Sequence, residues 1–170
     1  MQIFLIGFMG SGKSHCGKLW AANSDFSFID LDAVIEKNED TTIAKIFEEK
    51  GETYFRELEA TTLRSLSNQQ NTIIACGGGT PCFHNNMQWM NANGTTVYLK
   101  GTPQLLAQRV LNEKQQRPIL SNIKDEELED FIEKKLSERE LFYNQAKVIL
   151  DAGNVTNETF KMILGFNDKT

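Results

Sequence analysis

An eight-residue segment near the N-terminus has the residue types and spacing of a phosphate-binding loop. Residues 7–14 read GFMGSGKS, a complete G-x-x-x-x-G-K-S that follows an apolar run and opens a stretch of helical spacing. Backbone N–H groups of such a loop surround phosphate oxygens, and the helix N-terminus adds positive potential. We expect Lys13 to reach the β- and γ-phosphates of a nucleotide and Ser14 to ligate Mg²⁺. Nucleotide contacts are expected from Gly10, Ser11, Gly12, Lys13, Ser14 and the backbone N–H of His15.

Two carboxylates follow at the end of the next apolar run. In the segment SFIDLD at 27–32, Asp30 and Asp32 are two residues apart, so an extended chain would place both on one side. Beside a phosphate loop, one carboxylate could hold an acceptor hydroxyl and take its proton, and the other could support the metal. The alternative is structural: Asp32 precedes Ala-Val-Ile and could cap a helix.

Two arginines stand where an anionic group could bind. Arg56 has Glu59 three residues later, a spacing that could hold its guanidinium in place or form only an exposed helical ion pair. Arg139 falls within an apolar stripe of helical spacing, and an inward-facing arginine needs an anionic partner. That partner could be a ligand or a structural salt bridge, and Lys135 shares the same arc. The stripe consists of Leu128, Ile132, Leu136 and Tyr143.

Two loops could also approach a ligand. Gly77-Gly78-Gly79 directly follows an apolar run, and its backbone could approach a ligand closely or serve as a hinge. Arg117 precedes Pro118 at the end of a polar run, which predicts a flap carrying an arginine over a triphosphate or an ordinary solvated loop. The run before the glycines ends in Cys76 and offers no acid, so a metal would rely on Ser14 with Asp30 and Asp32.

The elements that position these residues alternate between short apolar runs and longer amphipathic stretches. This alternation predicts right-handed βαβ units and a parallel sheet of about five strands, with ligands beyond the carboxyl ends of the strands. Thr42 and Gly51 are expected as a helix N-cap and a helix-ending residue. The predicted strands are Ile3–Ile6, Phe26–Leu31, Thr72–Cys76, Thr95–Leu99 and Val148–Leu150. The helical stretches begin near Lys13, Ala33, Ile43, Tyr54, Asn85, Pro103, Glu126 and Asn157.

The composition sets outer limits on function. The 170 residues suit one domain, and 40% hydrophobic with 24% charged residues is ordinary for a globular chain. A net charge of −5 argues against general nucleic-acid binding, so an anion site must be local. Three cysteines without a CxxC pair favour a reducing cytoplasm. The apolar N-terminal run is a poor signal peptide, and no stretch approaches the length of a membrane helix.

The motifs together resemble the shikimate kinase family over nearly the whole chain. The matching segments, in order and spacing, are IGFMGSGKS at 6–14, FIDLD at 28–32, IFEEKGETYFRELE at 46–59, GGG at 77–79, RPIL at 117–120 and RELFY at 139–143. The resemblance implies an α/β fold, a P-loop NTPase three-layer αβα sandwich with a five-stranded parallel sheet in order 2-3-1-4-5. It also implies transfer of the ATP γ-phosphoryl to the 3-hydroxyl of shikimate, giving shikimate 3-phosphate and ADP on the route to chorismate and the aromatic amino acids.

The resemblance further implies a role for each matching residue. Lys13 and Ser14 would serve the phosphates and Mg²⁺, Asp30 would support the metal, and Asp32 would hold and activate the attacking hydroxyl. The shikimate carboxylate would bind Arg56 and Arg139, with the Gly78 backbone also touching the substrate, and Arg117 would contact ATP. Residues 33–63 would form a substrate-binding subdomain and 112–124 a lid within one domain, 1–170. We expect a cytoplasmic monomer that binds shikimate and ATP but neither nucleic acid nor membranes.

The chain departs from the family pattern at two places, and rival functions can be named. His15 stands where Thr is frequent, and Cys76 where Thr or Ser often precedes the glycines. Arg109 and the loop 152–155 occupy the region expected for adenine, but no sharp motif identifies the contacts. The rivals are a gluconate or nucleoside monophosphate kinase of the same fold and a non-catalytic nucleotide-binding module. The combination of Asp32, Arg56 and Arg139 with RPIL favours shikimate kinase over the other kinases of the same fold. The intact phosphate loop and the two carboxylates argue against a non-catalytic module.

Overall fold

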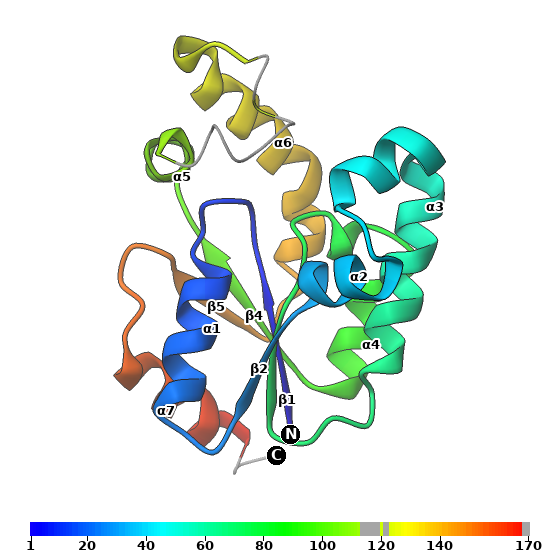
Figure 1. The fold of residues 1–170 in the computed structure, drawn as a ribbon. Coiled ribbons are helices and arrows are strands. Elements are labelled where there is room, and N and C mark those ends of the chain that lie inside the picture. The colour runs from blue at the N-terminus through cyan, green and yellow to red at the C-terminus, as the bar shows by residue number, and fades with distance from the viewer. Residues whose placement is uncertain (113–119, 121–122, 168–170) are drawn as a thin grey trace.

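The computed structural model describes residues 1–112, 120 and 123–167, and it is built on a parallel five-stranded sheet (Figure 1). β1 lies in the middle between β3 and β4, and the strand order is β2-β3-β1-β4-β5. The strand order and the parallel pairing confirm the expected fold. The strands are β1 (Gln2–Ile6), β2 (Ser27–Asp30), β3 (Thr72–Ala75), β4 (Thr95–Lys100) and β5 (Val148–Asp151).

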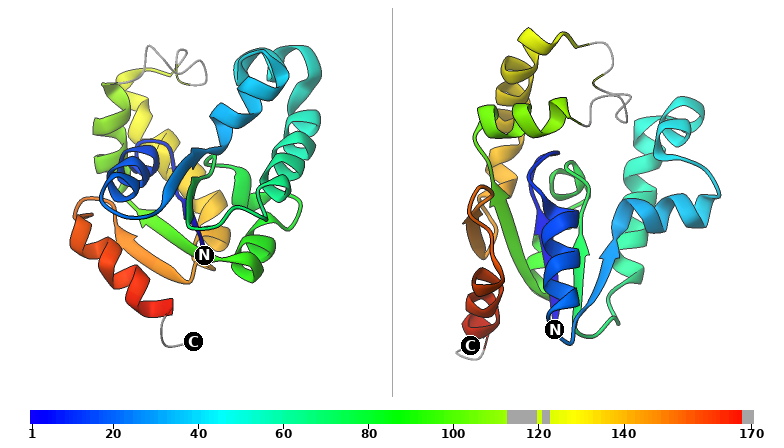
Figure 2. Two further views of the ribbon diagram at one scale, coloured as in Figure 1. Left: turned by 60° about the horizontal axis from the view of Figure 1, so that its bottom comes forward. Right: turned by 60° about the vertical axis from the view of Figure 1, so that its left-hand side comes forward.

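Helices cover both faces of the sheet and complete three layers (Figure 2). α1 and α7 pack on one face, and the other helices gather on the opposite face and at the carboxyl ends of the strands (Figures 1 and 2). The described helices are α1 (Lys13–Ala22), α2 (Leu31–Glu39), α3 (Ile43–Ser65), η1 (Thr80–Cys82), α4 (Asn86–Asn93), α5 (Pro103–Leu111), η4 (Asp125–Glu127), α6 (Leu128–Tyr143) and α7 (Asn157–Asn167). No helix within these ranges has both the length and the apolar character needed to cross a membrane.

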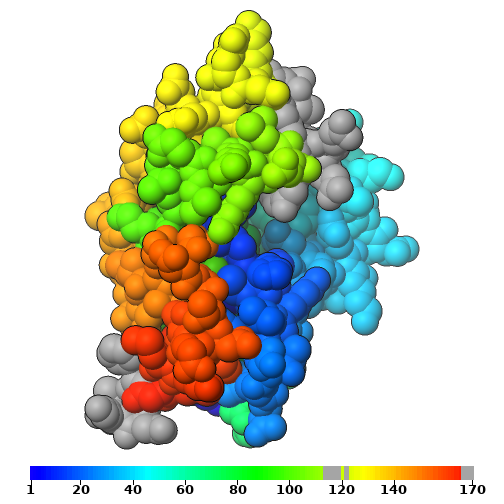
Figure 3. Space-filling model, turned by 90° about the vertical axis from the view of Figure 1, so that its left-hand side faces the viewer, coloured from blue at the N-terminus to red at the C-terminus, as the bar shows by residue number. Residues whose placement is uncertain are grey.

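Two hydrophobic clusters form the core because alternate residues of a strand face opposite sides of the sheet. In β1, Ile3 and Leu5 belong to the cluster beneath α1 and α7, while Phe4 and Ile6 belong to the cluster on the other face. Trp20 of α1 stacks on Phe160 of α7, with 5.1 Å between the ring centroids. In the space-filling view, α7 and the loop before it therefore lie directly against α1 (Figure 3).

The helix boundaries correct several expectations. Thr42 caps α3 as predicted, since its Oγ1 accepts a hydrogen bond from the Lys45 N–H at 3.3 Å. The chain turns sharply at Gly51, with φ of 81°, but helix resumes at once, so the separate helix expected from Tyr54 is the second half of a kinked α3. β2 ends at Asp30 and Leu31 already begins α2. The helix expected near Glu126 begins as the short η4, and α6 follows from Leu128.

Candidate functional site

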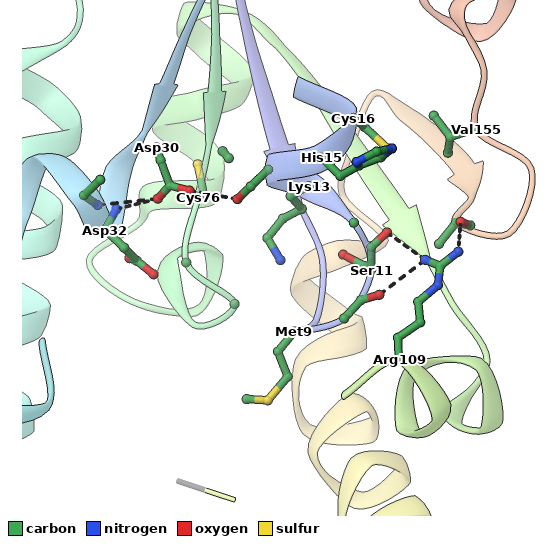
Figure 4. A pocket seen from close by; sticks show the side chains of 18 of the residues that line it. Met9, Ser11, Lys13, His15, Cys16, Asp30, Asp32, Cys76, Arg109 and Val155 are labelled. Carbon is green, nitrogen blue, oxygen red and sulfur yellow. Dashed lines mark hydrogen bonds between the residues drawn. The ribbon is translucent and has the colours of Figure 1, made fainter. Parts of the chain in front are cut away.

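A cavity of about 930 Å³ opens at the carboxyl ends of the strands, where ligands bind in parallel α/β sheets. The phosphate loop forms its base, and the end of β2, the turn after β3 and the loop after β5 form its sides (Figure 4). The expected nucleotide residues from Gly10 to His15 all line this cavity. Arg117 lies outside the described residues, as does most of the segment 112–124.

The phosphate loop has the backbone shape that its glycines permit. Gly10 and Gly12 have φ of 77° and 92°, a left-handed region that side chains rarely adopt, and Gly12 immediately precedes α1. The first N–H groups of α1 therefore have no partner within the helix and face the loop. Ser11 is 1% exposed, and among the described residues its Oγ has no hydrogen-bond partner. A buried hydroxyl of this kind fits a loop built to hold an anion.

The Lys13 side chain folds back over the loop. Its Nζ donates hydrogen bonds to the carbonyl oxygens of Gly7 at 2.8 Å and Phe8 at 3.0 Å. The ammonium group and the Asp32 carboxylate point the same way into the cavity (Figure 4). Lys13 thus places a positive charge beside the position that the motif assigns to the terminal phosphates.

Asp30 and Asp32 lie close together, but not because they share the side of a strand. Asp30 is the N-cap of α2, and its Oδ1 accepts from the N–H groups of Asp32 at 3.2 Å and Ala33 at 3.5 Å. Asp32 lies in the first turn of that helix. The expected extended geometry was therefore wrong, and the alternative in which Asp32 caps the helix does not hold either, because the helix begins two residues earlier than expected.

The second oxygen of Asp30 joins the phosphate loop. Asp30 Oδ2 accepts a hydrogen bond from Ser14 Oγ at 2.8 Å, so a carboxylate and a hydroxyl from two segments stand side by side. These are hard oxygen donors of the kind that Mg²⁺ prefers, and Mg²⁺ usually completes its shell with phosphate and water. The described residues contain no cluster of three or more His, Cys, Asp or Glu side chains that could hold a metal ion. The Ser14 hydroxyl and the Asp30 carboxylate are oxygen donors that fit a magnesium ion whose other ligands come from a nucleotide and water.

The surroundings of Asp32 alter its acidity. Burial and, to a smaller extent, the neighbouring carboxylates of Asp30, Glu59 and Glu36 together raise the pKa of its carboxyl to about 6, while Lys13 opposes them. A carboxylate whose pKa lies near neutrality is a better proton acceptor than an ordinary aspartate. Asp32 thus lines the cavity with a carboxyl that binds a proton more tightly than an ordinary aspartate does.

Arg56 is held by carboxylates on its own helix. Its Nη1 donates to Glu59 Oε2 at 3.0 Å, which confirms the predicted i,i+3 pair. Its Nε and Nη2 donate to Glu52 Oε1 at 3.2 and 3.0 Å. The Glu59 carboxylate is fully buried and also accepts a hydrogen bond from the Thr80 hydroxyl at 2.5 Å. Glu59 thereby ties Arg56 to the segment that follows the three glycines.

Arg139 projects from α6 toward the same segment. Its guanidinium lies over the Phe8 ring at 5.4 Å and beside the Tyr143 hydroxyl, whose pKa burial raises and the guanidinium lowers, and that hydroxyl donates to the Gly78 carbonyl at 2.5 Å. The predicted stripe is buried at Leu128, Ile132, Leu136 and Tyr143. Lys135, which shared that arc in the sequence, instead pairs with Glu138 at 2.7 Å.

The turn Gly77–Gly79 brings the acid and the two arginines together. A Cβ built on Gly77 would lie 3.1 Å from Asp32 Oδ1, one on Gly78 3.2 Å from Arg139 Nη1, and one on Gly79 2.7 Å from both terminal nitrogens of Arg56. A Cβ at any of these three positions would displace one of these polar groups. Arg56 and Arg139 do not line the phosphate-loop cavity itself and form an adjoining cationic pair beside it.

The Cys82 thiol lies near both guanidinium groups. Burial raises its pKa, and the two guanidinium groups only partly offset this increase.

Arg109 shapes the opposite end of the cavity. Its guanidinium donates to the carbonyls of Gly10 at 3.3 Å and Ser11 at 3.4 Å, and to that of Ala152 at 3.0 Å, so it joins the phosphate loop to the loop after β5 (Figure 4). Val155 from that loop lines the cavity. The His15 side chain is exposed at the cavity edge, whereas Cys16 is buried against the core.

The sequence did not reveal the residues whose side chains contact and orient the two arginines. Tyr143 appeared only as part of an apolar stripe, although its hydroxyl lies beside the Arg139 guanidinium and donates to the Gly78 carbonyl. Phe47, Phe55 and Phe83 surround the Arg56 guanidinium, at 5.8, 5.2 and 4.4 Å from Cζ to the ring centroids. The sequence signal for Phe47 and Phe55 was the density of aromatic residues near Arg56, whereas Phe83, far from Arg56 in the sequence, gave no such signal.

The phosphate loop follows the central strand of a parallel sheet with the strand order β2-β3-β1-β4-β5, and an acid and a pair of arginines lie beside it. These features define a phosphate-loop kinase of the type represented by nucleoside monophosphate kinases. The family model for shikimate kinase matches residues 9–166. The chain belongs to the shikimate kinase family.

Individual relatives support that assignment. A shikimate kinase from Bacteroides thetaiotaomicron is 45% identical over 152 residues, which cover 89% of this chain and 87% of the relative. A crystal structure of shikimate kinase from the same species has a TM-score of 0.92 at 40% identity, covering 97% of this chain and 98% of the other. A shikimate kinase from Acinetobacter baumannii in complex with shikimate has a TM-score of 0.85 at 29% identity, covering 96% and 93%.

Proposed function

We propose that this chain transfers the γ-phosphoryl group of ATP to the 3-hydroxyl of shikimate, producing shikimate 3-phosphate and ADP. The observation that carries the proposal is the convergence on one glycine turn of Asp32, Arg56 and Arg139, next to a complete phosphate loop. Such a site offers a base for a hydroxyl and two guanidinium groups for a carboxylate. Shikimate carries both groups on one ring.

ATP binds in the cavity with its phosphates on the loop. The N–H groups at the start of α1 and the buried Ser11 hydroxyl hold phosphate oxygens, and the Lys13 ammonium moves from its carbonyl partners to the β- and γ-phosphates. Arg109 and Val155 lie at the far end of the same cavity and receive the adenine. The backbone N–H of His15 contacts the α-phosphate.

Ser14 and Asp30 would hold Mg²⁺, Ser14 with its hydroxyl and Asp30 with its carboxylate, directly or through water. When bound, the ion neutralises charge on the β- and γ-phosphate oxygens. The capping hydrogen bonds to Oδ1 fix the orientation of the Asp30 carboxylate, so its second oxygen stays directed at Ser14.

Shikimate binds on the other side of Asp32. Arg56 and Arg139 bind its carboxylate, and the Gly78 backbone contacts the ring substituents. Asp32 accepts the proton of the attacking hydroxyl, and the proximity of Lys13 places that hydroxyl in reach of the γ-phosphorus. Residues 33–63 form the substrate-binding subdomain.

A turnover assay with a panel of acceptors tests this proposal. Purified protein with ATP and Mg²⁺ is offered shikimate, gluconate and nucleoside monophosphates, and ADP release is measured by a coupled reaction. We expect turnover with shikimate alone, and phosphorus NMR should locate the new phosphate ester on the 3-hydroxyl. Turnover with gluconate or a nucleotide, and none with shikimate, would overturn the proposed substrate.

A further inference from the structure

Phe83 is a large apolar side chain that the core does not explain. It directly follows η1 in extended backbone, is 37% exposed, and belongs to neither of the two hydrophobic clusters among the described residues. Its ring centroid lies 4.4 Å from Cζ of Arg56. A guanidinium at this distance from an aromatic ring is attracted to the electron-rich ring face.

Phe83 differs from the other two aromatic rings around Arg56. Phe47 and Phe55 lie farther from the guanidinium and pack on each other, with 4.6 Å between centroids, so the core accounts for them. Phe83 comes from the segment after the glycine turn rather than from α3. It is therefore the ring that can fix Arg56 relative to that turn.

The remaining hydrogen-bonding capacity of Arg56 makes its orientation important. A guanidinium has five N–H donors. Among the described residues, Glu52 accepts from the Nε donor and from one Nη2 donor, and Glu59 accepts from one Nη1 donor. One N–H on each terminal nitrogen is then left for a carboxylate ligand. A rotation of the guanidinium plane would turn these two donors away from the ligand.

We propose that Phe83 is a positioning residue for substrate recognition: its ring holds the Arg56 guanidinium plane so that the remaining N–H groups of the terminal nitrogens face the carboxylate of the substrate. The inference rests on the proposed role of Arg56 in binding shikimate. The Gly79 α-carbon closely approaches the same guanidinium, since a Cβ there would lie 2.7 Å from each terminal nitrogen and 2.9 Å from Cζ. The ring and the glycine together leave the side chain little freedom, and its exposed fraction is 11%.

The test compares Phe83→Leu with Phe83→Trp, since leucine keeps an apolar side chain without a π-face and tryptophan restores one. We expect Phe83→Leu to raise the KM for shikimate about twofold to thirtyfold, the range of a cation–π contact between exposed and desolvated settings. The kcat, the KM for ATP and the melting temperature should remain close to wild type. Phe83→Trp should restore the KM for shikimate to within about twofold.

Tyr54→Leu is the matched control. Tyr54 is also 37% exposed, lies on α3 and has its ring 4.5 Å from a cation, but that cation is Lys50. We expect its KM for shikimate to be unchanged. If Phe83→Leu behaves like Tyr54→Leu, or if tryptophan fails to rescue, the inference is wrong.

A double-mutant cycle with Arg56→Met, read out as shikimate binding by calorimetry, separates this inference from the proposed function. If Phe83 acts through Arg56, Phe83→Leu should have no further effect in the Arg56→Met background. An equal effect in both backgrounds would mean that Phe83 contacts the substrate directly, which overturns the positioning role alone. If Arg56→Met itself leaves shikimate affinity unchanged, the proposed carboxylate site fails and the inference fails with it.

Discussion

The Ser14 hydroxyl donates a hydrogen bond to the Asp30 carboxylate, with 2.8 Å between Oγ and Oδ2, and so links the phosphate loop to the end of β2. The other oxygen of the same carboxylate caps α2. One side chain thus serves helix stability through one oxygen and the proposed magnesium site through the other.

Two substitutions of Asp30 should separate these roles. Asn keeps an oxygen that can cap α2 but removes the charge, so Asp30→Asn should retain wild-type stability within about 0.5 kcal/mol and require more Mg²⁺ for half-maximal turnover. Asp30→Ala should lose both roles, with a further loss of about 1 kcal/mol in the free energy of unfolding. Urea unfolding and magnesium titrations of activity measure the two effects. Equal magnesium requirements in wild type and Asp30→Asn would exclude Asp30 from the metal site.

Asp32→Asn should reduce catalysis and stabilise the protein. Loss of a general base typically lowers kcat by about 10²- to 10⁴-fold, and ATP affinity should change little. An Asp32→Asn enzyme with wild-type kcat would assign proton removal to another group.

The stability effect of Asp32→Asn should depend on pH in a defined direction. Burial and neighbouring carboxylates raise the pKa of Asp32 from 3.8 to about 6 in the folded protein, so the folded state binds the proton more tightly than the unfolded state. The contribution of Asp32 to stability therefore falls as the pH rises from about 4 to about 6. In ligand-free protein, the gain of the Asn variant should be small at pH 4 and reach on the order of 3 kcal/mol at pH 7. A gain independent of pH would contradict the raised pKa.

The sequence predicted the site best where a motif determines the backbone. GFMGSGKS at 7–14 predicted a loop, a helix start at Lys13 and the cavity-lining residues, because a glycine-rich loop before a helix has few alternative shapes. The ion pair of Arg56 with Glu59 followed from helical spacing in the same way. Local geometry decides both features.

Relationships between segments could not be read from local spacing. Asp30 and Asp32 were expected on one extended strand, but whether the chain leaves the sheet at Asp30 or at Leu31 depends on packing of α2 against α3. Likewise, Phe83 reaches Arg56 because η1 and α3 meet across the glycine turn. Gly51 was correctly expected to interrupt a helix, but its continuation into the second half of α3 is set by tertiary contacts of Phe55 and Leu63.

Lys13→Ala should abolish most phosphoryl transfer without unfolding the protein. The Lys13 ammonium contacts loop carbonyls rather than the core, so we expect a melting temperature close to wild type. Removing one preorganised charge from the phosphates should lower kcat by at least about 10²-fold. A folded Lys13→Ala protein with near-normal turnover would disprove the assignment of the phosphate loop.

Arg56→Lys and Arg139→Lys should impair shikimate binding selectively. Lysine keeps the charge but lacks the planar fork that binds a carboxylate through two parallel hydrogen bonds. Each charged hydrogen bond contributes roughly 1.5–3 kcal/mol, so affinity for shikimate should fall about 10- to 150-fold. ATP affinity measured without shikimate should be preserved, because neither residue lines the phosphate-loop cavity. Weaker ATP binding with intact shikimate binding would favour a gluconate or nucleotide acceptor.

Gly79→Ala should damage the arginine site while leaving the fold intact. Gly79 has φ of −91° and ψ of −16°, which alanine adopts without strain. The added Cβ would lie 2.7 Å from both terminal nitrogens of Arg56, and the flexible end of that side chain must move away. We expect shikimate affinity to fall about tenfold or more, because the displaced guanidinium loses at least one charged hydrogen bond to the carboxylate.

Gly165→Ala on α7 is the matched control, since a Cβ there meets no atom within 4 Å. Both variants should melt close to wild type, and unchanged shikimate affinity in Gly79→Ala would show that the position of Arg56 against this turn is not required for binding.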